Sequence, residues 1–472
     1  MHESQQWPST TAGRLAQTLI SLIDSGYATG DQDELAAFYR EVASDNMQRE
    51  FSADNQAEWL MQLRRDTGPL RLRSITNSGG GFVESLLHTG DAETLVRFTL
   101  VESGGKIDGL LFEPVASSEL SPAASRPESV EEILRSVQQA TGVPGLAAAV
   151  YFKSELAHSA AIGVQEVGSD RPVRVDDAFH VGSLAKSMTA AVIASLVHNG
   201  DLSWDATVSE LNPDLGATSF YASITLRELL QHAAGLPAMT APGEDIDAAI
   251  ANVSGTPLEQ RREFARILVS NDAWAGTRGR FVYSNAGYAL AAHLAEHVSG
   301  RSWEDLVGDA VFSPVGMETA GFGWPASPDE PRRVRGHVEV EGELATLPFG
   351  EYELESFMAP AGDVHCSVID LAKWGNVQVR GFASDAAPFD LGMLSTLHTP
   401  DFDETYAFGW SLNPQRNGRP IVWHNGSAGT FYAHLQIDRD SELVIAIVCN
   451  AGPTNQPHIE AAAQAIAELV SR

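Results

Sequence analysis

The chain has 472 residues, and its 62 acidic side chains outnumber its 31 lysines and arginines, so the net charge is −31 at pH 7. This length predicts two or three domains, and so acidic a surface would repel the phosphates of a nucleic acid. No run reaches the roughly 18 apolar residues that a membrane-spanning helix needs, so we expect neither a nucleic-acid partner nor a membrane span.

Residues 1–117 are predicted to form a small α+β accessory domain. Three helical patterns are followed by four strand-like runs that Gly-rich turns separate. The helices are expected at 12–25, 33–42 and 55–65, and the strands at 70–76, 81–88, 94–101 and 107–115. Three helices followed by an antiparallel meander resemble the cone-shaped folds of the NTF2-like kind. No catalytic cluster is evident, and we expect a docking or substrate-shielding module.

Residues 118–129 are rich in Ser, Pro and Ala, which predicts a linker, and residues 130–472 are predicted to form a second domain. Strands are expected at 146–153, 157–165, 419–426, 430–438 and 442–450, a mostly helical insertion over roughly 184–400, and terminal helices at 130–142 and 459–470. The early and late strands can form one antiparallel sheet of five or more strands, flanked by the terminal helices. A cleft for a ligand would lie where the sheet meets the helical insertion.

Ser183 and Lys186 stand three residues apart where a helix, predicted from Ser183 to His198, begins. A step of three residues turns by about 300°, so the two side chains lie on one edge of the helix. The helix is apolar nearly all round and is therefore expected to be buried. Burial lowers the pKa of an ammonium group, so this lysine, one of four in the chain, could act as a base for the hydroxyl. Taken alone, the pattern is more often a helix cap.

A second motif places Tyr283 two residues before Asn285, at the start of another predicted helix. A tyrosine beside a Ser/Lys pair can pass a proton to a leaving group. An asparagine can hold the lysine through its carbonyl and donate to a substrate. Alone, this motif equally fits a tyrosine of the core.

A third motif, His424-Asn425-Gly426, lies on a predicted strand. A glycine there lets a substrate approach the strand closely. The N–H of Ser427 could pair with the N–H of Ser183 as an oxyanion hole. The alternative for the histidine alone is a surface position in a strand.

The order and spacing of these motifs resemble the serine β-lactamase-related hydrolases, which include class C β-lactamases, D-alanyl-D-alanine carboxypeptidases, D-aminopeptidases and family VIII esterases. The stretches ITLRELLQHAAGLP, SPVGM, APAGDVHCSVIDLAKW and YAFGWSL are also similar to the family, from about residue 130 to the end. S-x-x-K and K-T-G mark the neighbouring class A enzymes. The resemblance implies an α+β fold of the β-lactamase/transpeptidase type and an acyl-enzyme mechanism without a cofactor.

The resemblance also implies roles for single residues. Ser183 would attack the acyl carbon, Lys186 would take its proton, and Tyr283 would pass a proton to the leaving group and help activate water. Asn285 would orient the substrate and Lys186, and His424 would take the cation or donor position of the third motif, with Asn425 and Gly426 beside it. Whether Lys186 or Tyr283 is the base stays open, because the two form one coupled titrating unit.

The third motif departs from the Lys-Thr-Gly of β-lactamases, whose Lys and Thr help bind a carboxylate. A histidine is close to neutral at pH 7, so the sequence favours esters, or amides and peptides of small or D-amino acids. The alternatives are a true β-lactamase or penicillin-binding protein and, in another class, a non-catalytic ligand-binding sensor or scaffold. No G-x-S-x-G, H-E-x-x-H, phosphate-loop or dinucleotide motif occurs, so no metal or cofactor is expected.

The first residues lack the basic segment and apolar core of a signal peptide. We therefore expect a cytoplasmic protein, or a periplasmic or secreted one if a leader preceded this numbering. The two cysteines, Cys366 and Cys449, suit neither a disulfide framework nor a metal site, and both are expected to be buried.

Overall fold

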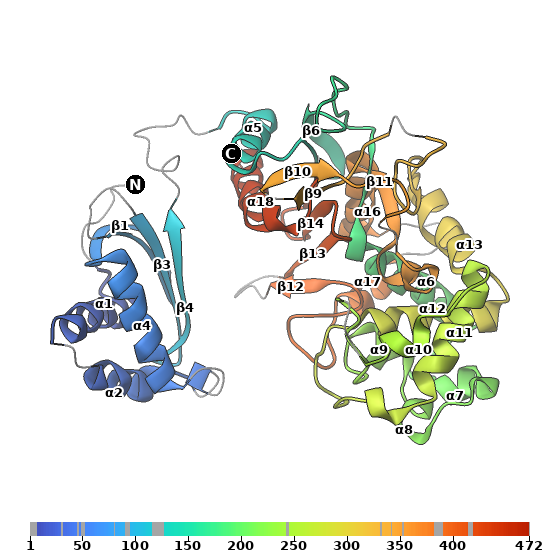
Figure 1. Cartoon of the computed structure of the whole chain (residues 1–472), viewed down its shortest axis with the longest axis horizontal. Coiled ribbons are helices and arrows are strands. Elements are labelled where there is room, and N and C mark those ends of the chain that lie inside the picture. Colours follow the sequence, from blue (N-terminus) through green and yellow to red (C-terminus); the bar gives the residue numbers. More distant parts are fainter. Residues whose placement is uncertain are drawn as a thin grey trace. The chain divides into compact units, whose positions relative to one another are not determined.

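The computed structural model describes residues 7–29, 32–44, 47–48, 52–79, 81–89, 95–115, 127–241, 245–330, 333–340, 342–351, 354–381, 390–413 and 419–471. The chain divides into two compact units, Met1–Arg126 and Pro127–Arg472 (Figure 1). Residues 118–126 of the predicted linker, 118–129, lie outside the described residues. No helix in the described ranges is both long and apolar enough to cross a membrane.

The first unit contains the three predicted helices and the predicted four-stranded meander. They are α1 (Thr11–Thr29), α2 (Asp33–Val42), α4 (Ala53–Thr67), β1 (Arg71–Gly79), β2 (Phe82–His88), β3 (Leu95–Ser103) and β4 (Lys106–Val115). The sheet is antiparallel in the order β1-β2-β3-β4, and Figure 1 shows the helices along one of its faces. Leu19, Leu60 and Phe98 belong to their shared core. The NTF2-like resemblance of this unit stays a prediction.

The second unit is built on one six-stranded antiparallel sheet. Its strands are β5 (Gly145–Phe152), β6 (Glu155–Gly163), β12 (Ser411–Asn413), β13 (Ile421–Ser427), β14 (Tyr432–Asp438) and β15 (Leu443–Cys449), in the order β12-β13-β14-β15-β5-β6. Helices α5 (Val130–Thr141) and α18 (Gln456–Val470) pack on one face, and α16 (Val368–Arg380) packs on the other. The prediction that early and late strands join in one sheet is confirmed, and Cys366 and Cys449 are buried and free.

The insertion between the two groups of strands is mostly helical, as predicted. Its helices are α6 (Ala185–His198), α7 (Val208–Leu211), α8 (Ser219–Ala222), α9 (Leu226–Leu230), α10 (Asp247–Ile250), α11 (Pro257–Val269), α12 (Asn285–Ser299), α13 (Trp303–Val307), α14 (Ser313–Val315), α15 (Ala359–Gly362) and α17 (Leu391–Leu397). Short strands that the sequence did not predict are β7 (Ala178–His180), β8 (Gly321–Phe322), β9 (His337–Val340), β10 (Glu343–Thr346) and β11 (Val364–Ser367). Runs of two to four residues carry too little alternation to be recognised.

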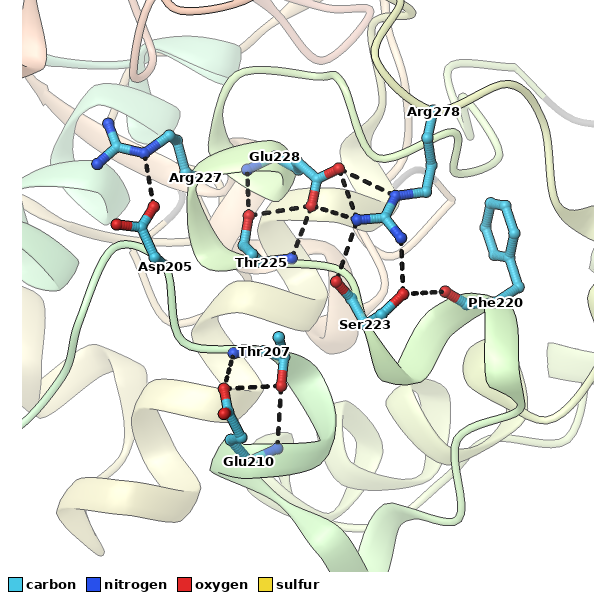
Figure 2. Close-up of polar contacts among 9 residues, drawn as sticks. All are labelled: Asp205, Thr207, Glu210, Phe220, Ser223, Thr225, Arg227, Glu228 and Arg278. Carbon is cyan, nitrogen blue, oxygen red and sulfur yellow. Dashed lines mark hydrogen bonds and ion pairs between the residues drawn. The ribbon is translucent and has the colours of Figure 1, made fainter.

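The start of α9 is held by a network of polar contacts (Figure 2). Thr225 caps the helix and shares a capping box with Glu228. Arg278 then binds both carboxylate oxygens of Glu228, at 2.6 and 2.7 Å, and also contacts Ser223. A charge-assisted pair of this kind ties the segment before Tyr283 to α9.

Candidate active site

Ser183 lies in a short turn that leads into the buried helix α6. The 3-10 turn Gly182–Leu184 (η2) precedes α6, so the α-helix begins at Ala185 rather than at Ser183. The Nζ atom of Lys186 lies 3.1 Å from Ser183 Oγ. The structure therefore brings the first predicted pair into hydrogen-bond contact.

Lys186 is completely buried, and among the described residues no carboxylate forms an ion pair with it. Desolvation holds its pKa well below the ordinary value. Its Nζ donates to Asn285 Oδ1 and to the carbonyl of Ala361, both at 2.7 Å. A neutral amine has two N–H groups and one lone pair, and both acceptors can only accept. In this neutral form, the lone pair of Nζ is left for the hydroxyl of Ser183.

Tyr283 lies on the other side of the lysine. Its ring centroid is 4.7 Å from Lys186 Nζ, and its side chain hydrogen-bonds Ser183. Burial raises the pKa of Tyr283 above its usual value, although the bond to Ser183 opposes the shift. The phenol therefore keeps its proton at neutral pH.

A loop after α9, residues 231–239, holds the second motif in place. His232 adopts a left-handed conformation with φ 57°. Its carbonyl accepts from the N–H of Val282, and its Nδ1 accepts from the N–H of Ser284, so both neighbours of Tyr283 are held. The ring centroids of His232 and Tyr283 lie 4.4 Å apart. Asn285 Nδ2 donates to the carbonyl of Met239. His232 was missed as a site residue, although it stands in the stretch ITLRELLQHAAGLP.

Two glycines let β13 approach the serine turn. A Cβ atom on Gly182 would lie 2.4 Å from Ser427 N, and one on Gly426 would lie 2.7 Å from Ser183 N and closer still to Val181 O. Gly182 also needs its left-handed φ of 53°. Strand β12 pairs with β13 only as far as Trp423, so the edge at residues 424–427 faces the serine turn. The backbone nitrogens of Ser183 and Ser427 are thereby brought close to each other.

His424 is buried, and the alternative of a surface histidine is wrong. Desolvation and the nearby Lys186 lower its pKa to about 4, so the imidazole is neutral at pH 7. Its Nε2 lies 3.5 Å from the hydroxyl of Tyr406. Asn425 points to the opposite face of β13, because side chains alternate along a strand, and it lies near Tyr432. Its backbone borders the site, whereas its side chain lies away from Ser183.

A partly buried pair that the sequence did not single out adjoins the nucleophile. His180 Nε2 lies 3.1 Å from Asp363 Oδ1, and His180 Nδ1 accepts from the N–H of Gly182 at 3.2 Å. Both ring nitrogens are therefore occupied, so these residues do not form a Ser-His-Asp triad with Ser183.

A serine that shares a hydrogen bond with a buried lysine, at the junction of this sheet and its helical insertion, defines a serine hydrolase. The model of the family described as beta-lactamase matches residues 130–469. The chain belongs to the β-lactamase family.

Three similar proteins illustrate the family. Penicillin-binding protein 4 of Amycolatopsis lactamdurans is 28% identical over 66% of this chain and 81% of its own length. Unguisins hydrolase ungD of Aspergillus violaceofuscus is 26% identical over 62% of this chain, and the matched region covers 56% of the length of that protein. The D-amino acid amidase of Ochrobactrum anthropi SV3 has the same fold, with a TM-score of 0.57, 22% identity and coverage of 72% of this chain and 98% of that one.

Proposed function

We propose that this protein hydrolyses esters, or amides and peptides of small or D-amino acids, through an acyl-enzyme on Ser183. The observation that carries the proposal is the setting of Lys186: it is desolvated, and its Nζ lies 2.7 Å from two acceptors and 3.1 Å from Ser183 Oγ. A desolvated amine so placed is a general base for the hydroxyl. Between the two candidates for the base, the raised pKa of Tyr283 favours Lys186.

In the proposed mechanism, Ser183 Oγ attacks the acyl carbon while its proton passes to Lys186. The backbone N–H groups of Ser183 and Ser427 stabilise the oxyanion. Tyr283 donates its proton to the leaving alcohol or amine and is reprotonated from Lys186. Water then attacks the acyl-enzyme and gives one proton to the same pair, which returns that proton to Ser183 Oγ as the free acid leaves.

The neutral state of His424 supports a neutral or weakly anionic substrate. A cation at this position would favour a carboxylate, but an imidazole with a pKa of about 4 carries no charge at pH 7. The net charge of −31 also disfavours the approach of anionic penicillins over long distances. We infer that small esters, and amides or peptides that lack a carboxylate near the scissile bond, are turned over faster than β-lactams.

A fluorophosphonate probe tests the nucleophile. The wild type and the exposed-site control Ser136→Ala should be labelled, and Ser183→Ala should not, with ester turnover falling about a thousandfold or more. Equal labelling of Ser183→Ala would refute the proposal.

A penicillin-binding protein is the second candidate, because a relative that bears this name is 28% identical to the chain. A stable penicillin adduct on Ser183 without turnover of small esters would favour this candidate. Rapid hydrolysis of nitrocefin would instead indicate a β-lactamase.

We also propose that residues 1–117 act as an accessory module that shapes the range of substrates. The first unit has its own hydrophobic core, and none of the candidate site residues lies in it. Deletion of this unit should alter turnover of large substrates more than turnover of a small ester. Identical rates for the full-length and the truncated protein on every substrate would argue against this role.

A further inference from the structure

The imidazole of His180 contacts the serine turn and is completely buried. His180 ends strand β7, and its Nδ1 accepts from the N–H of Gly182 at 3.2 Å. The next peptide group along the chain carries the N–H of Ser183, which is one of the two oxyanion donors in the proposed mechanism. A restraint on Gly182 is therefore also a restraint on that donor.

The serine turn needs such a restraint because its first residue is a glycine. Gly182 has a left-handed φ of 53°, and a glycine backbone can adopt many other conformations at little cost. The direction of the N–H of Ser183 is thus not fixed by local steric contacts. The hydrogen bond from Gly182 to His180 removes this freedom, since a buried N–H that loses its acceptor is destabilised.

Asp363 fixes the orientation of the imidazole. Because Nδ1 accepts, the proton of the ring is assigned to Nε2, which donates to Asp363 Oδ1 at 3.1 Å. Asp363 follows α15, and the carbonyl of Ala361 in that helix accepts from Lys186 at 2.7 Å. One short segment of the chain therefore contacts the base directly and the serine turn through His180.

The ring of His180 also packs against the segment that follows β13. Its centroid lies 4.5 Å from that of Trp324, in a stacked arrangement, and 6.3 Å from that of Phe431. Trp324 is held by a 2.9 Å hydrogen bond to Thr430 Oγ1. The carbonyl of Phe431 accepts from Ser427 Oγ at 2.6 Å, and Ser427 supplies the second oxyanion donor of the proposed mechanism. The imidazole thus contacts both segments that carry these donors.

We propose that His180, oriented by Asp363, is a positioning residue that holds the N–H groups of Ser183 and Ser427 in place for the oxyanion. This inference rests on the proposed function, because the oxyanion forms only when Ser183 attacks an acyl carbon. His180 acts through Gly182 rather than on the substrate. Its loss should therefore weaken binding of the transition state and leave binding of the ester in the ground state nearly unchanged.

His180→Phe tests the inference, because phenylalanine keeps an aromatic ring against Trp324 but has no acceptor for Gly182. With p-nitrophenyl butyrate, kcat should fall about tenfold to 100-fold, which is less than the loss of about 100-fold to 1,000-fold for removal of a whole oxyanion donor. KM should change less than about twofold, because the interaction is made in the transition state.

Two further measurements separate the oxyanion donors from the base. The inhibition constant of phenylboronic acid should rise by a factor similar to the loss of kcat. In that adduct Ser183 Oγ adds to boron, its proton passes to Lys186, and a boronate oxygen takes the place of the oxyanion. The acid limb of the pH profile of kcat/KM should not move, since Lys186 keeps its contacts with Asn285 and Ala361.

A conservative variant and a matched control complete the test. His180→Asn should restore most of the kcat lost in His180→Phe, because asparagine Oδ1 can replace Nδ1 as the acceptor for Gly182. His293→Phe also removes a buried imidazole that accepts a hydrogen bond, in this case from Asn212 at 3.2 Å, and should leave kcat unchanged. Asp363→Ala, which keeps the imidazole but not its orientation, should show a smaller loss of kcat without a change in KM.

Equal kcat values for His180→Phe and His293→Phe, or a loss that His180→Asn does not restore, would overturn the inference. A shifted acid limb with an unchanged inhibition constant for phenylboronic acid would also overturn it, because His180 would then act on Lys186. If His180→Phe does not fold, Asp363→Ala decides, and wild-type kcat in that variant would contradict the inference. A wild type that hydrolyses no p-nitrophenyl ester would instead refute the proposed function, and the inference with it.

Discussion

The chemistry proposed for the site depends on one buried amine, Lys186, which has no counter-ion among the residues that the structure describes. Lys186 is surrounded by uncharged acceptors and aromatic rings. Because its pKa is lowered in the folded state, the unfolded chain binds one more proton over the interval from the lowered pKa up to about 10.5. In that interval the free energy of unfolding rises with pH, by at most about 1.4 kcal/mol per pH unit from this group.

We expect the wild type to gain stability relative to Lys186→Met as the pH is raised from about 8 to about 10. Chemical denaturation of both proteins across this range measures the difference in free energy of unfolding, and Lys186→Met should be inactive throughout. A difference that does not change with pH would mean that Lys186 is charged in the folded protein.

The close approach of β13 to the serine turn depends on glycine at two positions. Gly182→Ala should remove most of the activity, about 100-fold or more, because the new Cβ would displace Ser427 from the serine turn. Gly216→Ala is the matched control, since Gly216 has a similar left-handed φ of 71° but no atom within 4 Å of the added Cβ. Both substitutions carry a backbone penalty of about 1–2 kcal/mol for a left-handed alanine, so equal losses of activity would show that strain, rather than displacement of β13, is responsible.

At the scale of elements, the second motif is held by the loop after α9 more than by its own helix. Gly276 and Gly279 donate to Gly235 and Ala233, and Asn285 donates to Ala238, in addition to the contacts of His232. The polar network at the start of α9 fixes the beginning of this loop (Figure 2). Tyr283 is therefore positioned by contacts with a separate segment of the chain.

His232→Asn should lower kcat about tenfold with little change in KM, because asparagine tolerates the left-handed conformation but loses the ring contact and the bond to Ser284. The loss of kcat caused by His232→Asn should be smaller when Tyr283 is already replaced by Phe. A double-mutant cycle measures this difference. The control His293→Asn alters another buried histidine, on α12, and should leave kcat unchanged. Additive losses in the cycle would show that His232 acts independently of Tyr283.

At the scale of the molecule, the second unit buries several neutral histidines. Desolvation lowers the pKa of His293, His424 and His434 to about 4 and that of His398 to about 3. Each is neutral in the folded state, whereas in the unfolded chain it becomes charged below about pH 6.5. Unfolding therefore takes up protons between about pH 6.5 and 4, and stability falls as the pH falls through this range.

Urea denaturation at a series of pH values should show this loss, with a slope of about 1.4 kcal/mol per pH unit for each histidine that becomes protonated. In His398→Gln, unfolding should take up about one proton fewer, so the free energy of unfolding should depend less steeply on pH, by about 1.4 kcal/mol per pH unit. An unchanged slope in this variant would indicate that His398 already carries its proton in the folded protein.

The sequence by itself determined the local elements and the family. Hydrophobic periodicity and the turn residues predicted the helices and strands, because these signals act over a few neighbouring residues. The three-residue spacing of Ser183 and Lys186 also survives the change from a helix start to a 3-10 turn, since both conformations keep such residues on one edge.

Only the tertiary structure decided how the site works, because its decisive contacts join residues far apart in the chain. Lys186 and Asn285 are 99 residues apart, and His180 and Asp363 are 183 residues apart. The neutral state of His424 likewise follows from burial that no local pattern indicates. Proton affinity depends on the solvation and charges around a group, and these are set by packing between distant segments rather than by sequence neighbours.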